Sequence, residues 1–311
     1  MPARPDSVKT AFAFPGVGVR PDGREAEFYE RHVEWMKPCL EEASETAGAD
    51  LVRALLDGAI ESMGDEKNQY FTYAYCGGLA GVLERAGLRP AFTAGYSFGI
   101  YAALHAAGAV TFTDGLRMAR KAYELMSEAS RGREAGMAVV IGLGGEDLAS
   151  LIEKLGLETA SIVNSNNELC KVLSGKRKDL EVLLAEAARQ GALSGQLLEV
   201  GIPYHHPALL RGVSASFMDF LATVEWKRPV CAVVSSIDQE FLTEPGELIE
   251  FASANLSTPI SWQKVVEALA GAGVARIVEC GPGISLTQNG RFITGGLKYV
   301  NTRNILRRLG L

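Results

Sequence analysis

The chain has 311 residues, of which 47% are hydrophobic and 22% are charged. This balance is typical of a globular protein and excludes a disordered or fibrous chain, and the length predicts one large domain or about two smaller ones. The 31 Lys and Arg residues against 37 Asp and Glu residues give a net charge of −6, with no long run of like charges, so nucleic acid is not an expected partner.

Short apolar runs alternate with longer helical patterns, which predicts an α/β fold. The elements expected in the first part of the chain are strands over 10–14 and 91–94 and helices over 68–86, 98–107 and 115–129. Gly87 and Pro90 supply the stop signals of the first helix, and Thr113 or Asp114 is expected to cap the last.

The middle of the chain has a different pattern. The elements expected there are strands over 137–143, 160–164, 170–174 and 196–200 and helices over 146–155 and 176–190. Their order, βαββαβ, is that of a ferredoxin-like unit. The segments 130–133 and 201–203 on either side contain glycine and are candidate hinges.

After this unit the α/β pattern returns. The elements expected there are helices over 207–224 and 259–270 and strands over 231–235 and 276–279. We therefore expect a large α/β domain made of residues 1–131 and 200–311, and an inserted ferredoxin-like βαββαβ subdomain over residues 132–199.

The cysteines are odd in number and scattered, without a CxxC spacing or a His/Cys cluster, so neither a disulfide framework nor a metal site is expected. The first ten residues lack the apolar segment of a secretory signal. The most apolar stretch, 91–112, is interrupted by Gly, Ser and His, which argues against a membrane span. These features predict a cytoplasmic protein with reduced thiols.

The strongest chemical signal is GYSFG at residues 95–99, a G-x-S-x-G sequence between a predicted strand and a predicted helix. In this context it is a nucleophile elbow, whose glycines allow the tight reversal that exposes the Ser97 hydroxyl at a helix N-terminus. The helix dipole and free N–H groups there favour developing negative charge. The pattern also occurs in purely structural turns, but the strand–turn–helix context favours a nucleophile and makes the large domain α/β-hydrolase-like.

A serine nucleophile needs a base, and the chain has four histidines. His105 lies two turns after Ser97 on the same predicted helix and is expected to pack there, while His32 is expected to face solvent. His205 and His206 lie in the loop sequence PYHHP, where a restricted backbone would hold an imidazole in place. Adjacent side chains point in different directions, so one of these two is expected to be the base, unless the pair only begins a helix.

These residues resemble a known family. GYSFGIYAAL at 95–104 is similar to the GHSxGEYAAL sequence of malonyl-CoA:acyl-carrier-protein transacylases and polyketide-synthase acyltransferases. Other matches follow in order over nearly the whole chain: FPGVG at 14–18, Asn68-Gln69, NSN at 164–166, VLSG at 172–175, PYHHP at 203–207, LSTPISW at 256–262 and ECGPG at 279–283.

Carried over by position, the resemblance implies that Ser97 is the nucleophile and that His205 is the general base and acid. The family uses a Ser–His dyad whose imidazole is steadied by a backbone carbonyl, which Asn255 or its neighbour would supply. The oxyanion hole would consist of the backbone N–H groups of Val17 and Phe98. Because these donors belong to the backbone, Val17 in place of the family's Gln does not exclude catalysis.

One departure from the family concerns the substrate. Malonyl-using members hold the free carboxylate with an Arg in the helix after the elbow, and an ungapped alignment places Ala122 there. Arg120 and Lys121 point in other directions around a helix, although a register shift of one residue would bring Lys121 into place. Because losing one partner of a desolvated charge pair costs roughly 2–5 kcal/mol, an acyl group with a free acid, such as malonyl, is disfavoured.

Further departures lie near the nucleophile. Tyr96 replaces the family's His, and Ile100 replaces its Glu. Together with Ala122 and Tyr204 they predict a more apolar acyl pocket, to which Gln69 also contributes. Alternatively, the aromatic residues only pack in the core.

The leading hypothesis is a discrete, trans-acting acyltransferase of a polyketide-type pathway, which works by a ping-pong mechanism. Ser97 would take a non-carboxylated acyl group (acetyl, a longer starter chain or an unusual unit) from a coenzyme A or carrier-protein thioester and pass it to an acyl carrier protein. The phosphopantetheine thioester is substrate, and no bound cofactor or metal is implied. We expect a monomer.

The alternative is an acyl-carrier-protein hydrolase of the same family, in which water reaches the acyl-Ser97 ester and releases stalled chains. A non-catalytic docking member is disfavoured because Ser97 and His205 are both present. An esterase of the α/β-hydrolase type is disfavoured by the βαββαβ insert and by the lack of an evident acid.

Carrier proteins present an acidic helix, so the resemblance predicts a basic rim near the cleft. A basic segment lies close to the C-terminus, and it is either part of this rim or a solvated tail. Its residues are Arg291, Lys298, Arg303, Arg307 and Arg308.

Overall fold

The computed structural model describes residues 8–19, 21–293 and 295–308, without the side chain of Arg308. The strands are β1 (Thr10–Phe14), β2 (Phe92–Gly95), β3 (Ala135–Ile141), β4 (Ser161–Asn167), β5 (Cys170–Lys176), β6 (Ser194–Leu197), β7 (Ala232–Val234), β8 (Phe241–Leu242), β9 (Ile260–Ser261), β10 (Arg276–Glu279) and β11 (Lys298–Asn301).

The helices in the first part of the chain are α1 (Glu25–Arg31), α2 (Val33–Ala47), α3 (Leu51–Leu56), α4 (Asp65–Arg85), α5 (Ile100–Ala106) and α6 (Phe112–Ser130), with 3-10 turns η1 (Ile60–Met63) and η2 (Ser97–Gly99). Those that follow are α7 (Gly145–Lys154), α8 (Arg177–Arg189), α9 (Val213–Leu221), α10 (Pro245–Ala254), α11 (Trp262–Gly271), α12 (Ser285–Gly290) and α13 (Thr302–Arg308). Among the described residues, no helix combines the length and the apolar character that crossing a membrane requires.

The larger sheet has the strand order β11-β10-β1-β2-β7-β8, in which β1 lies parallel to both of its neighbours. Successive side chains of a strand point to opposite faces. Ala11 and Ala13 accordingly pack with Trp262 and its neighbours on α11, whereas Phe12 and Phe14 join the core that includes α4 and α5. Helices thus cover both faces, which explains why the short run TAFAF is apolar throughout.

The positions of β1 and β2 determine where a site can form. Because the two strands are parallel neighbours, the loops that follow them leave the sheet at the same edge. In open α/β sheets, ligands bind in the crevice outside the carboxyl ends of the strands. The loop after β1 contains Val17, and the turn after β2 contains Ser97.

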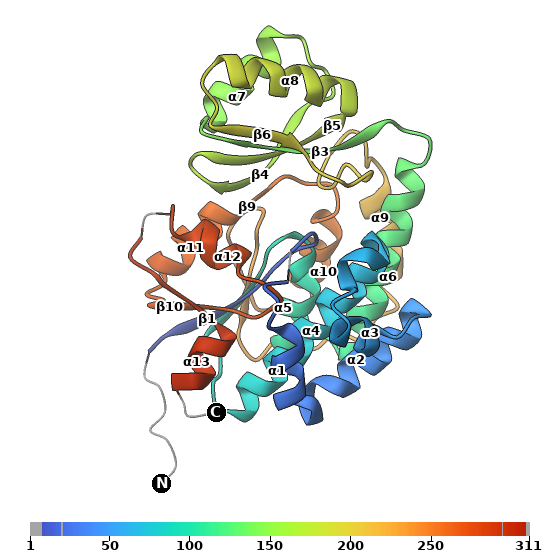
Figure 1. Ribbon diagram of the computed structural model, residues 1–311, viewed down its shortest axis with the longest axis vertical. Coiled ribbons are helices and arrows are strands. Elements are labelled where there is room, and N and C mark those ends of the chain that lie inside the picture. The colour runs from blue at the N-terminus through green and yellow to red at the C-terminus, as the bar shows by residue number, and fades with distance from the viewer. Residues whose placement is uncertain (1–7, 20, 294, 309–311) are drawn as a thin grey trace.

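The smaller sheet has the order β6-β3-β5-β4-β9, and its first four strands are antiparallel neighbours. Figure 1 shows this sheet at the top of the view, with α7 and α8 above it. Ala138 and Leu173 pack among the residues of these helices, while Met137 and Val172 on the other face join the core of the large sheet. The predicted class, an α/β-hydrolase-like layer with a ferredoxin-like βαββαβ unit, is confirmed.

The fifth strand of this sheet comes from outside the predicted insert. The sequence predicts a helix over 259–270, but Ile260–Ser261 form β9, which pairs in parallel with β4. The helix begins only at Trp262, with the Ser261 side chain accepting a hydrogen bond from the backbone of Lys264. The unit therefore does not complete its sheet alone, and the domain division at residues 132 and 199 stays a prediction.

Other local predictions were wrong in instructive ways. The helix predicted over 207–224 begins at Val213, because Gly212 has a left-handed backbone and the residues before it form turns. The N-cap of α6 is Thr111, whose side chain accepts a hydrogen bond from the backbone of Asp114. The local sequence patterns did not indicate α10 or α13.

Candidate active site

Ser97 lies at the tip of the turn between β2 and α5, with a left-handed φ of 53°. Such backbone costs on the order of 1–3 kcal/mol in a residue other than glycine. The turn is possible because its glycines lie close to backbone atoms. A Cβ on Gly95 would lie 2.2 Å from the Ile100 nitrogen, and one on Gly99 would lie 2.1 Å from the Phe14 carbonyl oxygen. The turn thus has the strand–turn–helix geometry of a nucleophile elbow.

His205 comes from a loop 108 positions away along the chain, and its Nε2 atom lies 2.6 Å from Ser97 Oγ. Its φ of 61° is also left-handed. Its backbone N–H donates to the carbonyl of Leu256 over 3.2 Å. The structure therefore brings together the serine and the histidine that the sequence pattern selects.

The imidazole of His205 is buried, and burial lowers its pKa to about 4, while backbone groups of Asn255 and Thr258 act in the opposite direction. These backbone groups lie near the ring, but Nδ1 makes no hydrogen bond of good geometry among the described residues, and the steadying role of the Asn255 carbonyl stays a prediction. The Asn255 side chain donates to the Ser97 carbonyl over 3.4 Å. At neutral pH the imidazole is therefore uncharged and is able to accept a proton from Ser97.

The other histidines have different surroundings. His206 Nδ1 accepts hydrogen bonds from the backbone N–H groups of Ala208 and Leu209, and its Nε2 lies 2.7 Å from the Thr159 carbonyl oxygen. Both of its ring nitrogens are thus occupied. His105 packs at the end of α5, with its ring against Phe112.

Val17 and Phe98 line the same pocket as Ser97 and His205. Phe98 stands in the first turn after the elbow, where N–H groups have no intrahelical acceptor. The loop that contains Val17 lies against the elbow, since a Cβ on Gly16 would come within 2.9 Å of the Tyr96 ring. Two backbone donors near the nucleophile suit a developing oxyanion, and their role stays a prediction.

The walls of this pocket are mainly apolar and aromatic. Besides Ser97 and His205, the lining residues are Val17, Gln69, Phe98, Tyr101, Met126, Tyr204, Asn255 and Leu256. The space left among them is small, about 20 Å³, which is room for about one water molecule. Among the described residues, no Arg or Lys lines it.

Two of the four side chains predicted for the acyl pocket lie elsewhere. The hydroxyl of Tyr96 donates to Asn166 Oδ1 over 2.7 Å and its ring packs edge-on against Trp262, so this side chain points to the small sheet. Ala122 is buried in α6 and does not line the pocket. Lys121, the alternative cation, is partly exposed and lies 3.8 Å from Glu124. Gln69 and Tyr204 do line the pocket.

Asp65 was missed in the sequence analysis. The hydroxyl of Tyr204 donates to Asp65 Oδ2 over 3.0 Å, and the Gln69 amide donates to the Tyr204 oxygen over 3.0 Å. Burial raises the pKa of Asp65, while the hydrogen bonds from Tyr204 and Gln69 counteract this rise. The i, i+4 spacing of Asp65 and Gln69 on one helix face was the available signal.

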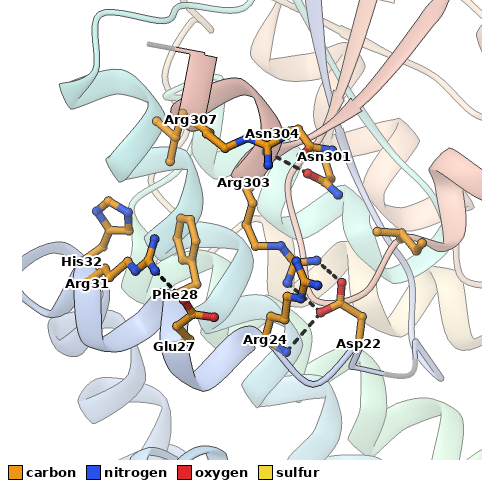
Figure 2. A pocket seen from close by; sticks show the side chains of 12 residues that line it. Asp22, Arg24, Glu27, Phe28, Arg31, His32, Asn301, Arg303, Asn304 and Arg307 are labelled. Carbon is orange, nitrogen blue, oxygen red and sulfur yellow. Dashed lines mark hydrogen bonds and ion pairs between the residues drawn. The ribbon is translucent and has the colours of Figure 1, made fainter. Parts of the chain in front are cut away.

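A second pocket, of about 430 Å³, lies between α1 and α13 and is lined by charged side chains (Figure 2). Arg303 is paired there with Asp22, and Arg31 with Glu27. It shares no lining residue with the Ser97 pocket and, among the described residues, has no Ser or Cys in its wall. The Ser97 pocket, which holds both the serine and the histidine, is the candidate reaction site.

The basic C-terminal segment is only partly open. Arg303 is half-buried in its ion pair, whereas Arg291, Lys298 and Arg307 are exposed. The side chain of Arg308 lies outside the described residues. Within the described part of the chain, no three His, Cys, Asp or Glu side chains form a group able to hold a metal ion.

A nucleophile elbow on a parallel α/β sheet, a serine and a neutral histidine in one apolar pocket and a βαββαβ insert define an enzyme of the acyl-transfer class. The family model described as the acyl transferase domain matches residues 34–294. The malonyl CoA-acyl carrier protein transacylase of Bacillus subtilis is 31% identical over 305 residues, which cover 95% of this chain and 91% of that protein. The chain therefore belongs to the acyl transferase family.

Solved structures agree with this assignment. The acyl-carrier-protein S-malonyltransferase of Burkholderia pseudomallei has a TM-score of 0.89 and 28% identity, over 97% of this chain and 100% of that one. A malonyl-transacylase solved in complex with a type II polyketide-synthase acyl carrier protein has a TM-score of 0.88 and 26% identity, over 94% of this chain and 95% of that one. The predicted enzyme class is confirmed.

Proposed function

We propose that the protein is an acyltransferase that moves a non-carboxylated acyl group from a coenzyme A or carrier-protein thioester onto an acyl carrier protein. The observation that carries the proposal is the 2.6 Å contact between Ser97 Oγ and His205 Nε2, in a pocket whose described lining residues include no cation. The acceptor is inferred from the relatives, one of which is a transacylase bound to a carrier protein.

The first half-reaction forms an ester on Ser97. Its oxygen attacks the thioester carbonyl carbon while His205 Nε2 takes the hydroxyl proton. The tetrahedral oxyanion accepts hydrogen bonds from the backbone N–H groups of Val17 and Phe98. When the carbon–sulfur bond breaks, the imidazolium returns the proton to the leaving thiolate.

The second half-reaction reverses these roles. His205 takes the proton of the phosphopantetheine thiol, the sulfur attacks the ester carbonyl, and the Ser97 oxygen leaves and recovers its proton. Water that enters at this stage would make the enzyme a hydrolase instead. Transfer is favoured here because one of the similar enzymes is solved in complex with its carrier protein.

The choice of a non-carboxylated acyl group departs from the relatives described above, whose names specify malonyl. Ala122 stands where the family resemblance predicts an arginine, and it is buried in α6. Lys121 lies outside the pocket, close to Glu124. A carboxylate buried without a cation costs roughly 2–5 kcal/mol relative to the paired state, so malonyl is a poor substrate in this proposal.

The test is covalent loading of Ser97. The protein is incubated with acetyl-, butyryl- or malonyl-coenzyme A and its intact mass is recorded, with Ser97→Ala as the blank. We expect acetyl or butyryl adducts that form faster than a malonyl adduct, persist in buffer and disappear when holo-carrier protein is added. Preferred malonyl loading would contradict the choice of substrate, and loss of the adduct in buffer alone would identify a hydrolase.

Three broader expectations belong to the same proposal. They are a polyketide-type pathway, a cytoplasmic location and a monomeric state. The polyketide link is supported by the carrier protein in one of the similar structures, which comes from a type II polyketide synthase. Comparing loading of carrier proteins from polyketide and fatty-acid pathways tests this link.

A further inference from the structure

Asp65, Gln69 and Tyr204 form a hydrogen-bonded cluster at the wall of the Ser97 pocket. Gln69 and Tyr204 line the pocket, and Asp65 lies one hydrogen bond behind them. The cluster joins the first turn of α4 to the residue that precedes His205, across 139 positions of sequence for the pair of Asp65 and Tyr204. Neither the family resemblance nor the comparisons assign a role to Asp65.

The direction of these hydrogen bonds determines which hydrogen-bond donors in the pocket wall are free to bind a substrate. Tyr204 has one hydroxyl proton, and it goes to Asp65 Oδ2. The Gln69 amide nitrogen donates to the Tyr204 oxygen and also lies 3.4 Å from Asp65 Oδ2. The carboxylate of an acid-bearing acyl group would need such hydrogen-bond donors if it were buried in this pocket, but Asp65 already accepts those of Gln69 and Tyr204. The hydroxyl of Tyr101, which also lines the pocket, has no hydrogen-bond partner among the described residues. As a single neutral donor it does not replace the donors of Gln69 and Tyr204.

Asp65 also contributes charge. It has no ion-pair partner among the described residues, and the α6 cations Arg120 and Lys121 pair with Glu124. An acid group seated against the Tyr204 hydroxyl would come within about 6 Å of the Asp65 carboxylate. Like charges at that separation in a partly screened site disfavour binding by about 10- to 100-fold.

We propose that Asp65 is a specificity-determining residue, which withdraws the donors of Gln69 and Tyr204 from the pocket and places a negative charge behind its wall. The pocket then selects small acyl groups that end in neutral carbon, of the acetyl class, against acyl groups that end in an acid. The inference rests on the proposed function. It is separate from the effect of Ala122, because a missing arginine removes attraction whereas Asp65 adds repulsion.

The test compares malonyl and acetyl loading in the variant Asp65→Asn. The amide keeps the size of the side chain and still accepts the Tyr204 hydrogen bond, but it has no charge. Initial rates of Ser97 acylation are measured with malonyl- and acetyl-coenzyme A for the wild type and the variant. We expect the ratio of malonyl to acetyl rates to rise about 10- to 100-fold.

The matched control is Glu66→Gln. Glu66 is the next residue of α4 and also accepts a hydrogen bond from a tyrosine hydroxyl, that of Tyr70 over 2.8 Å, but it is exposed and does not line the pocket. Its substitution is expected to leave the ratio unchanged. An equal rise in both variants would show a general effect of net charge and would overturn the proposal.

Tyr204→Phe provides an independent measurement if Asp65→Asn does not fold. It removes the hydroxyl and releases the Gln69 donor, so the ratio should rise, although less than with Asp65→Asn because the charge remains. An unchanged ratio in the variants that fold would overturn the role of Asp65. If the wild type itself prefers malonyl, the proposed function fails, whereas the change in the ratio still decides whether Asp65 acts on specificity.

Discussion

The Ser97 pocket, here called the Ser97–His205 crevice, and the inserted βαββαβ unit both consist of strands, helices and the turns between them. They differ in the backbone conformation of their residues. Among the described residues, three other than glycine have a left-handed φ, and Ser97 and His205 are two of them. Buried polar atoms without a hydrogen-bond partner in the described structure occur in both regions: His205 Nδ1 and Asn255 Oδ1 beside the crevice, and Asn164 Oδ1 in β4. Between β3 and β6, no residue other than glycine has a positive φ.

This difference shows where the molecule stores strain. The inserted unit is held by helix and sheet packing, and its apolar core includes Leu148, Leu173 and Leu180. In the crevice, the unfavourable backbone of Ser97 and His205 is held by contacts from β1, α4 and the loop after α10. Strain that persists at one place usually belongs to a functional site. Substitutions at the two regions should therefore have very different effects.

The largest effect is expected for Ser97→Ala. Without the hydroxyl no ester can form, so acyl loading should fall by about 10⁴-fold or more, to the level of protein incubated without acyl-coenzyme A. Intact-mass measurement with acetyl-coenzyme A checks this, and thermal unfolding should show that the variant is folded. A residual acyl adduct in this variant would place the nucleophile elsewhere.

The two adjacent histidines should separate catalysis from stability. His205→Asn should lower the acylation rate by about 10³- to 10⁴-fold, because it removes the base. His206→Asn should instead lower the free energy of unfolding, by about 1–3 kcal/mol, because it breaks contacts to Ala208, Leu209 and Thr159. Acylation rates and denaturant unfolding measure the two effects, and the opposite pattern would assign the base to His206.

A pair of glycine substitutions tests the contrast in backbone strain. Gly99→Ala in the elbow should destabilise the fold by about 3 kcal/mol or more, because the new Cβ would meet the Phe14 carbonyl oxygen at 2.1 Å. Gly145→Ala, in the first turn of α7, meets only Lys171 at 3.6 Å and should be neutral or stabilise by up to about 1 kcal/mol. Similar destabilisation by both changes in urea unfolding would contradict the contrast.

The smallest effect in the physiological range is that of pH. Since acylation needs neutral His205 and burial lowers its pKa to about 4, the rate should stay level from pH 8 to about 5 and fall below that. The free energy of unfolding should also decrease as the pH falls. An unfolded histidine binds a proton near pH 6.5, so this group's contribution to stability is complete above that value and decreases as pH falls toward 4. An acylation rate that halves near pH 6.5 would show that His205 is not buried as described.

Much of the fold followed from local patterns. The run at 10–14, the GYSFG turn and the βαββαβ order are each set by side chains within a few residues of one another, through periodicity and turn chemistry. The elements that were wrong or missed depend on distant partners. Residues 260–261 form a strand only because β4 offers an open edge, and the start of α9 depends on Gly212 and the turns before it.

The candidate site divides in the same way. By itself, the sequence indicated the family and predicted Ser97 as nucleophile and His205 as base, because short motifs and the strand–turn–helix pattern around Ser97 are readable locally. Only the tertiary structure decided that Tyr96 points to the small sheet, that Ala122 lies away from the pocket and that Asp65 stands behind Tyr204. The direction of a side chain and the neighbours of a buried charge depend on contacts between segments far apart in the chain. No local sequence pattern contains these contacts.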